Sequence, residues 1–136
     1  MSDLLELTVV TPERVVLKES VYSLVLPGVD GYLGVLPNHA PMLAALKIGV
    51  VKYRRPGGEF SPLAVSGGFF EVSNNKAVIL ADSAERPEEI DLNRARAARE
   101  RAEKRLRSKA ENIDFHRAQL ALQRAINRLR VARWDE

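Results

Sequence analysis

The hydrophobic pattern of the chain changes its period once, near Pro87. Before this point Leu5, Leu7 and Val9 alternate with polar residues, the period of two that is typical of a half-buried strand. Pro, Gly and Asn interrupt similar short apolar runs about every ten residues. The expected strands cover 5–9, 15–17, 21–26, 48–54, 60–65, 69–72 and 77–81. Short strands at this spacing predict a sandwich or barrel rather than a parallel α/β sheet.

Turn-forming residues separate several of these strands. The Arg-Pro-Gly-Gly segment at 55–58 and the Ser-Asn-Asn-Lys segment at 73–76 each lie between two apolar runs, and each predicts a hairpin turn. Gly67-Gly68 follows a strand and precedes two phenylalanines. We predict a further tight turn there, because glycine adopts backbone conformations that other residues avoid. A phosphate-binding loop is not indicated at this pair.

After Pro87 the chain is rich in Ala, Arg, Glu and Leu, which are strong helix formers. The pattern predicts one helix from about 91 to 110, a turn at 112–114 that supplies a new N-cap, and a second helix to about 132. The short turn makes the two helices antiparallel neighbours. Their expected contact seams at helical spacing are Ala95, Ala98, Ala102 and Leu106 on the first helix, and Phe115, Ala118, Leu122, Ala125, Ile126 and Leu129 on the second.

Charge divides the chain at the same place. Residues 1–87 hold 8 Lys and Arg against 9 Asp and Glu, a net charge of −1, whereas residues 88–136 hold 13 against 9, a net charge of +4. We therefore predict two domains, a β domain at 1–87 and a two-helix hairpin at 88–136. The absence of cysteine excludes disulfides and thiolate chemistry and fits a reducing compartment. No apolar run is long enough to span a membrane, and no signal or transit peptide is recognisable.

Reactive groups in a catalytic arrangement are not evident. The two histidines, His39 and His116, lie in different halves, and a lone histidine is more often structural than catalytic. The chain has no Gly-x-x-x-x-Gly-Lys loop and no Gly-x-Ser-x-Gly motif. We therefore expect a protein without catalytic residues and without a bound metal.

Three stretches together carry a family resemblance. Residues 31–41 read G-Y-L-G-V-L-P-N-H-A-P, residues 66–72 read S-G-G-F-F-E-V, and residues 90–95 read I-D-L-N-R-A. They are similar, in this order, to segments of the epsilon subunits of bacterial proton-translocating ATP synthases. The third resembles the I/L-D-x-x-R-A motif of epsilon subunits that bind ATP. The similarity extends into the hairpin, at 112–115 and 124–128.

The resemblance implies an N-terminal antiparallel β-sandwich of two five-stranded sheets, followed by the helical hairpin. It implies a rotor subunit of the central stalk that binds the gamma subunit and the ring of c subunits at the cytoplasmic face of the bacterial cell membrane, without entering the membrane. The expected ring contact is Gly31, Tyr32 and Leu33; Tyr32 stands where relatives often carry a polar or acidic residue. An extended hairpin would reach the catalytic alpha and beta subunits and inhibit ATP hydrolysis, and the arginines expected to meet acidic residues of beta are Arg117, Arg124, Arg128, Arg130 and Arg133.

The resemblance also implies that the folded hairpin holds ATP, with or without Mg, as a regulatory ligand and not as a substrate, and that no cofactor is required. The residues expected to bind it are Glu85, Ile90, Asp91, Arg94, Ala95, Arg101, Arg124 and Arg128. Helical spacing supports part of this set. If the hairpin turns near residues 111–112, Arg94 lies level with Arg128 and Arg101 with Arg124, so their guanidinium groups would converge.

Two other readings remain open from the residues alone. The hairpin carries many other basic residues, and some alignments of arginines across it are expected by chance. A basic hairpin could follow the phosphates of a nucleic acid, although acidic residues are interspersed and aromatic residues suited to base stacking are nearly absent. The hairpin could also serve a free-standing adaptor as a coiled coil. Co-purification with gamma, alpha and beta subunits would separate these alternatives from the first.

Overall fold

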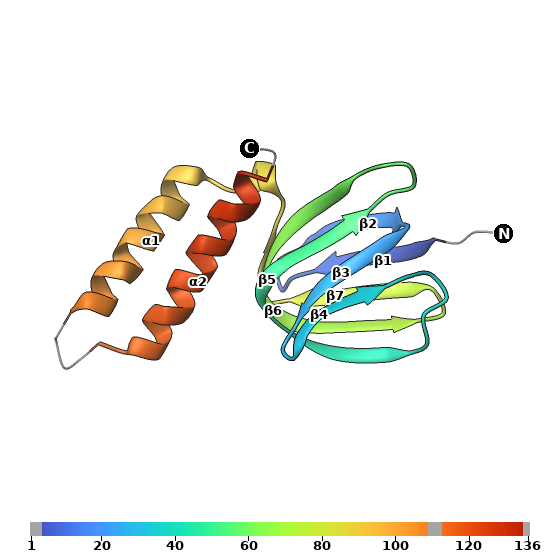
Figure 1. Ribbon diagram of the computed structural model, residues 1–136, viewed down its shortest axis with the longest axis horizontal. Coiled ribbons are helices and arrows are strands. Elements are labelled where there is room, and N and C mark those ends of the chain that lie inside the picture. The colour runs from blue at the N-terminus through green and yellow to red at the C-terminus, as the bar shows by residue number, and fades with distance from the viewer. Residues whose placement is uncertain (1–3, 109–112, 135–136) are drawn as a thin grey trace.

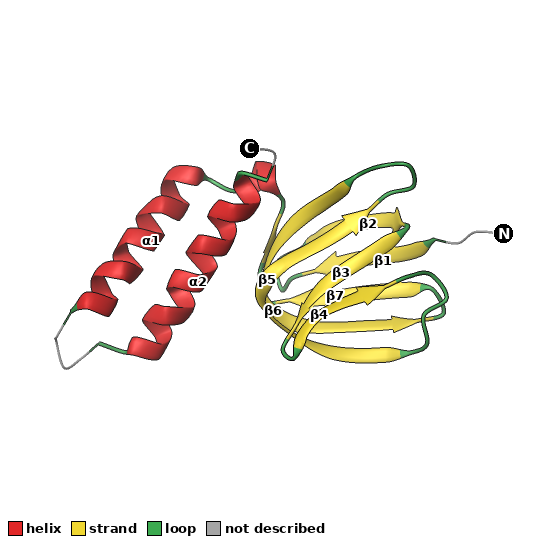
Figure 2. Cartoon of the chain, viewed as in Figure 1, coloured by secondary structure: helices red, strands yellow, loops and turns green. Residues whose placement is uncertain are grey.

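A computed structural model describes residues 4–108 and 113–134 and divides the chain into a β domain and a helical hairpin (Figures 1 and 2). The β domain contains strands β1 (Leu5–Val10), β2 (Val15–Val21), β3 (Ser23–Gly28), β4 (Gly31–Val35), β5 (Met42–Arg54), β6 (Phe60–Ser73), β7 (Lys76–Ala81) and β8 (Ala84–Glu85). A short 3₁₀ turn (Pro87–Glu89) leads to helices α1 (Leu92–Arg107) and α2 (Phe115–Ala132). The predicted order of a β domain and then two helices is confirmed.

The sandwich is built around two long strands that belong to both layers. The strands form one hydrogen-bonded sheet in the order β2-β1-β7-β6-β5-β3-β4, with β8 on β6. Residues 42–46 of β5 pair with 68–72 of β6, and residues 48–54 pair with 60–66. The layer that contains 42–46 and 68–72 continues into β7, β1 and β2. The layer that contains 48–54 and 60–66 continues into β3, β4 and β8. Each layer thus holds five strand segments, which is how the two expected five-stranded sheets are realised in one folded-over sheet.

Strands β4 and β8 lie outside the expected strands, and three further features differ from them. Gly67-Gly68 is not a turn between two strands; it lies inside β6, where φ values of 79° and 121° bend the strand from one layer to the other. Strand β5 begins at Met42, six residues before the expected start, because it continues into the second layer. β1 and β7 pair in parallel, whereas the other described strand pairs are antiparallel. A long-range parallel pair leaves no mark on local periodicity.

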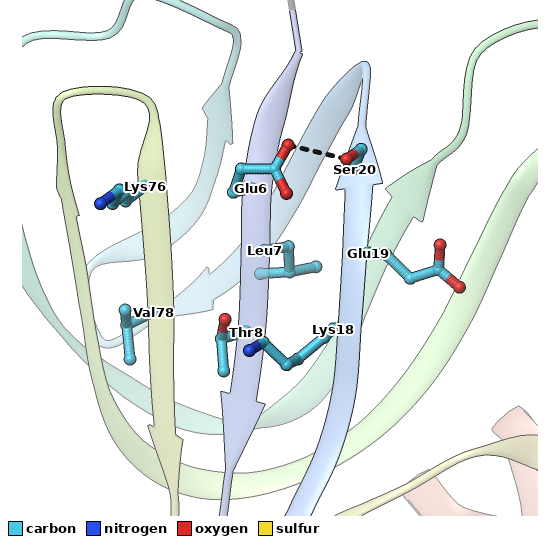
Figure 3. Close-up of a pocket in the computed structure, with 8 residues that line it drawn as sticks. All are labelled: Glu6, Leu7, Thr8, Lys18, Glu19, Ser20, Lys76 and Val78. Atoms are coloured by element: carbon cyan, nitrogen blue, oxygen red, sulfur yellow. Dashed lines mark hydrogen bonds between the residues drawn. The ribbon is translucent and has the colours of Figure 1, made fainter.

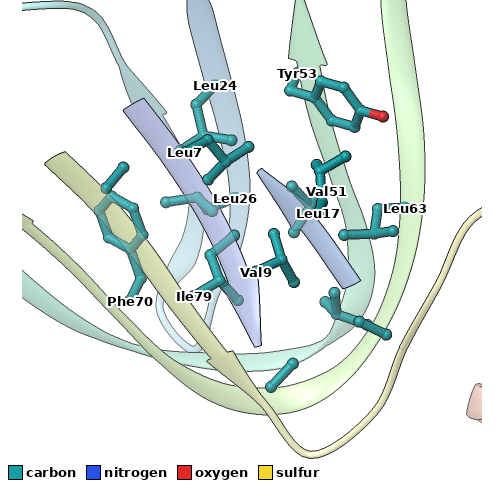
Figure 4. Packing of buried hydrophobic residues seen from close by; sticks show 14 of the residues in the cluster. Leu7, Val9, Leu17, Leu24, Leu26, Val51, Tyr53, Leu63, Phe70 and Ile79 are labelled. Atoms are coloured by element: carbon teal, nitrogen blue, oxygen red, sulfur yellow. The ribbon is translucent and has the colours of Figure 1, made fainter. Parts of the chain in front are cut away.

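The main core fills the space between the two layers (Figure 4). Its largest side chains with almost no exposed surface include Phe70, Leu5, Leu7, Leu17, Leu24, Leu26, Leu63 and Ile79. Full burial of one such side chain stabilises the fold by roughly 1.5–3 kcal/mol. All residues of this core lie between Leu5 and Ala84, so the sandwich has a complete core without the hairpin.

Both predicted hairpin turns are confirmed. Residues 55–59 connect β5 to β6 and include the predicted turn at 55–58, where Gly57 has a positive φ of 71°. Asn74 and Asn75 connect β6 to β7 with φ values of 52° and 60°. Two successive positive φ values are typical of a type I′ turn, and asparagine tolerates them better than most residues.

The two helices begin where their caps were predicted. The side chain of Asp91 accepts a hydrogen bond from the backbone N–H of Arg94 at 3.1 Å, and Asp114 accepts one from Arg117 at 3.0 Å. Such caps satisfy N–H groups that have no partner within the helix. The described part of α1 ends at Arg107, and the expected turn residue Asn112 and helix end at Ala110 lie outside the described residues.

The contact between the helices follows the predicted alanine seam. Ala95 and Ala102 of α1 are buried, as are Ala118 and Ala125 of α2. Small side chains let the two helix axes approach closely. Phe115 was wrongly assigned to this seam, since half of it is exposed at the first residue of α2.

Candidate nucleotide site and interaction surfaces

Helix α2 lies between α1 and the sandwich and makes the contacts that attach the hairpin to the sheet (Figure 1). A second hydrophobic cluster forms at this junction from Val50 of β5, Ala64 of β6, Ile90, Ala95, Leu129 and Val131. Val50 faces the hairpin while the next residue, Val51, faces the main core, so β5 is apolar on both sides here. The hairpin is therefore docked on the outer face of one sandwich layer.

A buried asparagine fixes the docked position of α2. Asn127 is only 5% exposed, and its Nδ2 donates a hydrogen bond to the carbonyl oxygen of Gly49 at 2.7 Å. Leaving either buried group without a partner would cost about 1–3 kcal/mol. The predicted seam does not include this residue, because Asn127 lies on the opposite side of α2, in line with Leu120 and Val131. This second apolar row was the available signal.

Three of the predicted ATP-binding residues meet in a narrow cleft between α2 and the sandwich. Glu85, Arg124 and Arg128 line it together with Asn127 and residues of β6, around a cavity of about 30 Å³. Glu85 and Arg128 form a bidentate pair, with Nε to Oε1 at 2.7 Å and Nη2 to Oε2 at 3.1 Å. Both side chains keep slightly over a quarter of their surface exposed. Arg128 is thus held in place by a residue 43 positions away in the sequence.

The remaining predicted ATP-binding residues lie on the first helix and its approach. Ile90 and Ala95 are buried in the junction cluster, and Asp91 is the N-cap of α1. Arg94 and Arg101 are exposed on α1 and are not among the residues that line the cleft. Ala95 and Leu129, which follow Arg94 and Arg128 in the sequence, belong to one cluster. The structure therefore brings together Glu85, Arg124 and Arg128, and leaves Arg94 and Arg101 on the neighbouring helix.

The loop that was expected to contact the c ring forms the start of β4. Gly31 has a φ of 132°, and Leu33 packs against the main core. Tyr32 is 53% exposed, but its hydroxyl group turns towards the hairpin side of β5 and accepts a hydrogen bond from the backbone N–H of Val50 at 3.4 Å. Of the three residues, Gly31 turns the chain into β4, Tyr32 is half-exposed beside β5, and Leu33 packs on the core.

The arginines expected to contact the beta subunit are distributed over two sides of α2. Arg124 and Arg128 follow Arg117 by seven and eleven residues, about two and three helical turns, so the three share one side of α2. Arg130 lies on the opposite side. Arg117, Arg124 and Arg130 are exposed, and Arg133 is exposed at the C-cap of the helix. In the docked hairpin Arg124 and Arg128 are turned towards the cleft beside Glu85.

The layer that faces away from the hairpin carries two further surfaces on its outer face. A shallow polar cavity of about 540 Å³ lies over β1, β2 and β7, where Ser20 donates a hydrogen bond to Glu6 at 2.7 Å (Figure 3). At its rim a hydrogen bond from Arg55 at 2.8 Å lowers the pKa of Glu19. None of the predicted site residues lies in this cavity, and we assign no ligand to it.

The second surface is an exposed apolar patch on β5, β6 and β7. Leu43, Phe69 and Leu80 are 70%, 57% and 56% exposed, and they surround a groove that Glu71 and Val78 also line. Phe69 faces outward because the next residue, Phe70, is buried in the core. Clustered large apolar side chains on a surface usually mark a protein contact. This patch and the docked hairpin lie on the outer faces of different layers.

Comparison with known proteins covers both domains. Residues 4–87 match the family described as the ATP synthase delta/epsilon chain beta-sandwich domain, and residues 88–133 match its long alpha-helix domain. The ATP synthase epsilon chain of Desulforamulus reducens is 54% identical over 103 residues, which are 76% of this chain and 77% of the relative. That of Moorella thermoacetica is 54% identical over 105 residues, or 77% of this chain and 78% of the relative.

Solved structures show the same arrangement. A chain of the Euglena gracilis mitochondrial ATP synthase structure, which contains OSCP, F1 and the c-ring, superposes with a TM-score of 0.77 at 26% identity over 90% of this chain and 78% of that one. A chain of the Tetrahymena thermophila mitochondrial ATP synthase central stalk and c-ring has a TM-score of 0.56 at 16% identity over 96% and 95%, which shows a shared fold. The chain therefore belongs to the ATP synthase delta/epsilon chain family, and within it to the epsilon chains.

Proposed function

We propose that this epsilon chain is a non-catalytic part of the central stalk, which couples the catalytic head to the c ring and restrains ATP hydrolysis through its hairpin. The observation that carries the proposal is the division of the molecule. The sandwich has a complete core of its own, and the hairpin is attached to it through one face of α2. An element attached in this way can leave the sandwich without unfolding it.

The sandwich supplies the surfaces for neighbouring subunits. The apolar patch of Leu43, Phe69 and Leu80 suits a permanent contact with the gamma subunit, since obligate interfaces are rich in large apolar side chains. The loop at 31–33 is the surface we assign to the c ring. These contacts would hold the chain at the cytoplasmic face of the bacterial cell membrane. No helix in the described part of the chain is long and apolar enough to cross a membrane.

ATP, with or without Mg, would bind at the cleft beside Glu85 and would favour the docked hairpin. Glu85 precedes α1, while Arg124 and Arg128 lie on α2, so these residues meet only while the hairpin is docked. A ligand that contacts both parts shifts the equilibrium towards docking by its difference in affinity for the two forms. In the absence of ligand, Glu85 balances the charge of Arg128, and phosphate groups would bind this arginine together with Arg94 and Arg101 from α1.

Thermal unfolding of the isolated chain tests this site. ATP is expected to raise the melting temperature, and Arg94→Ala or Arg128→Ala should abolish most of the rise. Each charge-assisted bond contributes roughly 1.5–3 kcal/mol, so the loss of one arginine should weaken binding about tenfold or more, as measured by calorimetric titration.

Arg107→Ala is the matched control, because Arg107 is exposed at the far end of α1 from the cleft and should leave the response to ATP intact. Equal losses in all three variants would indicate nonspecific charge attraction. Absence of any ATP effect on the parent chain would remove the site.

A further inference from the structure

A lysine on the sandwich lies within reach of two aromatic rings, one from each side of the junction. The Nζ of Lys52 on β5 is 6.0 Å from the ring centroid of Tyr32 and 5.9 Å from that of Trp134. Tyr32 belongs to β4 of the sandwich, whereas Trp134 follows α2 and packs against the junction cluster. A cation within about 6 Å of an aromatic face is attracted to it.

From this geometry we propose that Tyr32, Lys52 and Trp134 form a clasp that holds the hairpin docked without nucleotide. The hairpin contributes only Trp134 to the clasp, so the contact between Lys52 and this ring is made only in the docked form. Tyr32 holds the lysine from the other side and is itself tied to β5 by the bond from Val50. The role of Tyr32 is thus to support the hairpin, in addition to any contact of its loop with the c ring.

The backbone beside the clasp is shaped for close packing. A Cβ atom on Gly49 would lie 2.6 Å from Cβ of Pro27 and 3.2 Å from the hydroxyl oxygen of Tyr32. The carbonyl oxygen of the same glycine accepts the hydrogen bond from Asn127 of α2. Tyr32 and α2 therefore converge on one residue of β5, and this residue has room for no side chain.

The clasp lies apart from the nucleotide residues. Tyr32 lines a groove of about 260 Å³ with Gln123, Ile126 and Arg130 of α2. Glu85, Arg124 and Arg128 line the separate cleft on the other side of the same helix, and Asn127 lies between the two. Substitutions in the clasp can therefore change docking without touching the proposed ATP contacts.

The clasp also links two parts of the molecule that were expected to act separately. This consequence rests on the proposed assignment of the 31–33 loop to the c ring. A partner that binds this loop and turns Tyr32 away from Lys52 would remove half of the clasp and favour release of the hairpin.

Amide hydrogen exchange of the full chain without nucleotide tests the clasp. Helices in proteins owe most of their stability to the packing of an apolar face, so undocking weakens α2 and exposes its amides, and exchange of α2 reports the undocked fraction. Lys52→Met keeps an unbranched side chain that is only one atom shorter and removes the charge. We expect exchange of α2 relative to β1 to rise roughly two- to fivefold, and acrylamide quenching of Trp134, the only tryptophan, to increase.

Matched variants separate the clasp from general effects. Lys18→Met, on an exposed position of β2, should change neither measurement. Tyr32→Phe keeps the ring but loses the bond from Val50, so it should raise exchange less than Tyr32→Leu, which should resemble Lys52→Met. In the double variant of Tyr32→Leu and Lys52→Met, exchange of α2 should rise little more than in either single variant, because both substitutions remove the same interaction.

Unchanged exchange and quenching in Lys52→Met, or an equal effect of Lys18→Met, would overturn the proposal. Full additivity in the double variant would do so as well, since it would show that the two residues act independently. Because no nucleotide is present in these measurements, a negative result leaves the ATP site and the proposed function standing.

Discussion

At the scale of single residues, the position of Gly68 decides how β6 can pass through both layers. Its φ is 121°, and a Cβ atom added there would lie 2.1 Å from the carbonyl oxygen of Leu80 and 2.8 Å from Cα of Ala81. Both obstacles are backbone atoms, which cannot move aside as the end of a flexible side chain can. The pairing of β6 with β7 therefore depends on the absence of a side chain at this residue.

We expect Gly68→Ala to destabilise the protein by about 3 kcal/mol or more, because alanine adds both an unfavourable backbone conformation and a collision with β7. Urea unfolding of the full chain measures this change. Gly34→Ala is the control: Gly34 lies in β4, and a Cβ atom there would meet nothing within 4 Å. It should be neutral or stabilising by up to about 1 kcal/mol. Equal effects of the two substitutions would contradict the argument from backbone contact.

At the scale of elements, the sandwich and the hairpin depend on each other to different degrees. The main core contains residues of the sandwich alone, whereas the hairpin shares its buried surface with Val50 and Ala64 of the sheet. α1 contacts the sandwich less than α2 does, because within the described residues its extensive contacts are with α2. The sandwich should therefore fold alone, and the hairpin should depend on docking for most of its stability.

A chain truncated after Pro87 is expected to unfold cooperatively on heating, at a temperature modestly below that of the full chain. The loss comes from exposure of Val50 and Ala64, which Leu129 and Val131 no longer cover. Calorimetry would measure the transition, and agreement between calorimetric and van't Hoff enthalpies would establish two-state unfolding. A broad, non-cooperative transition would contradict the boundary at Pro87.

At the scale of the whole molecule, the patch that we assign to the gamma subunit and the docked hairpin lie on different faces. The patch of Leu43, Phe69 and Leu80 lies on the outer face of one layer, and the hairpin packs on the outer face of the other. Binding to the gamma subunit through the patch would leave the hairpin free to dock or to extend. Assembly and regulation can thus be separated by substitution.

We expect deletion of residues 88–136 to raise ATP hydrolysis by the assembled enzyme while leaving its subunit composition unchanged. The arginines of α2 would no longer reach the beta subunit, whereas the patch and the 31–33 loop would be intact. Hydrolysis rates of parent and deleted enzymes, purified in parallel and matched for subunit content, provide the measurement. Unchanged hydrolysis would remove the hairpin from the inhibitory mechanism, and loss of gamma would show that the sandwich is not sufficient for assembly.

The sequence by itself determined the features that depend on residues close together in the chain. The caps Asp91 and Asp114 bond to N–H groups three residues away, and Asn74 and Asn75 form their turn locally. Strand and helix periods follow from which side of each element is buried. Helical rise predicts the levels of the candidate ATP residues on the hairpin, and the family resemblance predicts which residues they are; both stay predictions.

Only the tertiary structure decided the contacts between distant segments. The parallel pairing of β1 with β7, the bond of Asn127 to Gly49 and the pair of Glu85 with Arg128 join residues that no local period relates. Gly67-Gly68 suits a turn and a bend equally well, and the pairing of β6 with β5 and β7 selects the bend. The environment of Tyr32 depends likewise on where Lys52 and Trp134 meet it. Local hydrogen bonding fixes the elements, but the burial of their remaining faces against one another fixes which distant side chains become neighbours.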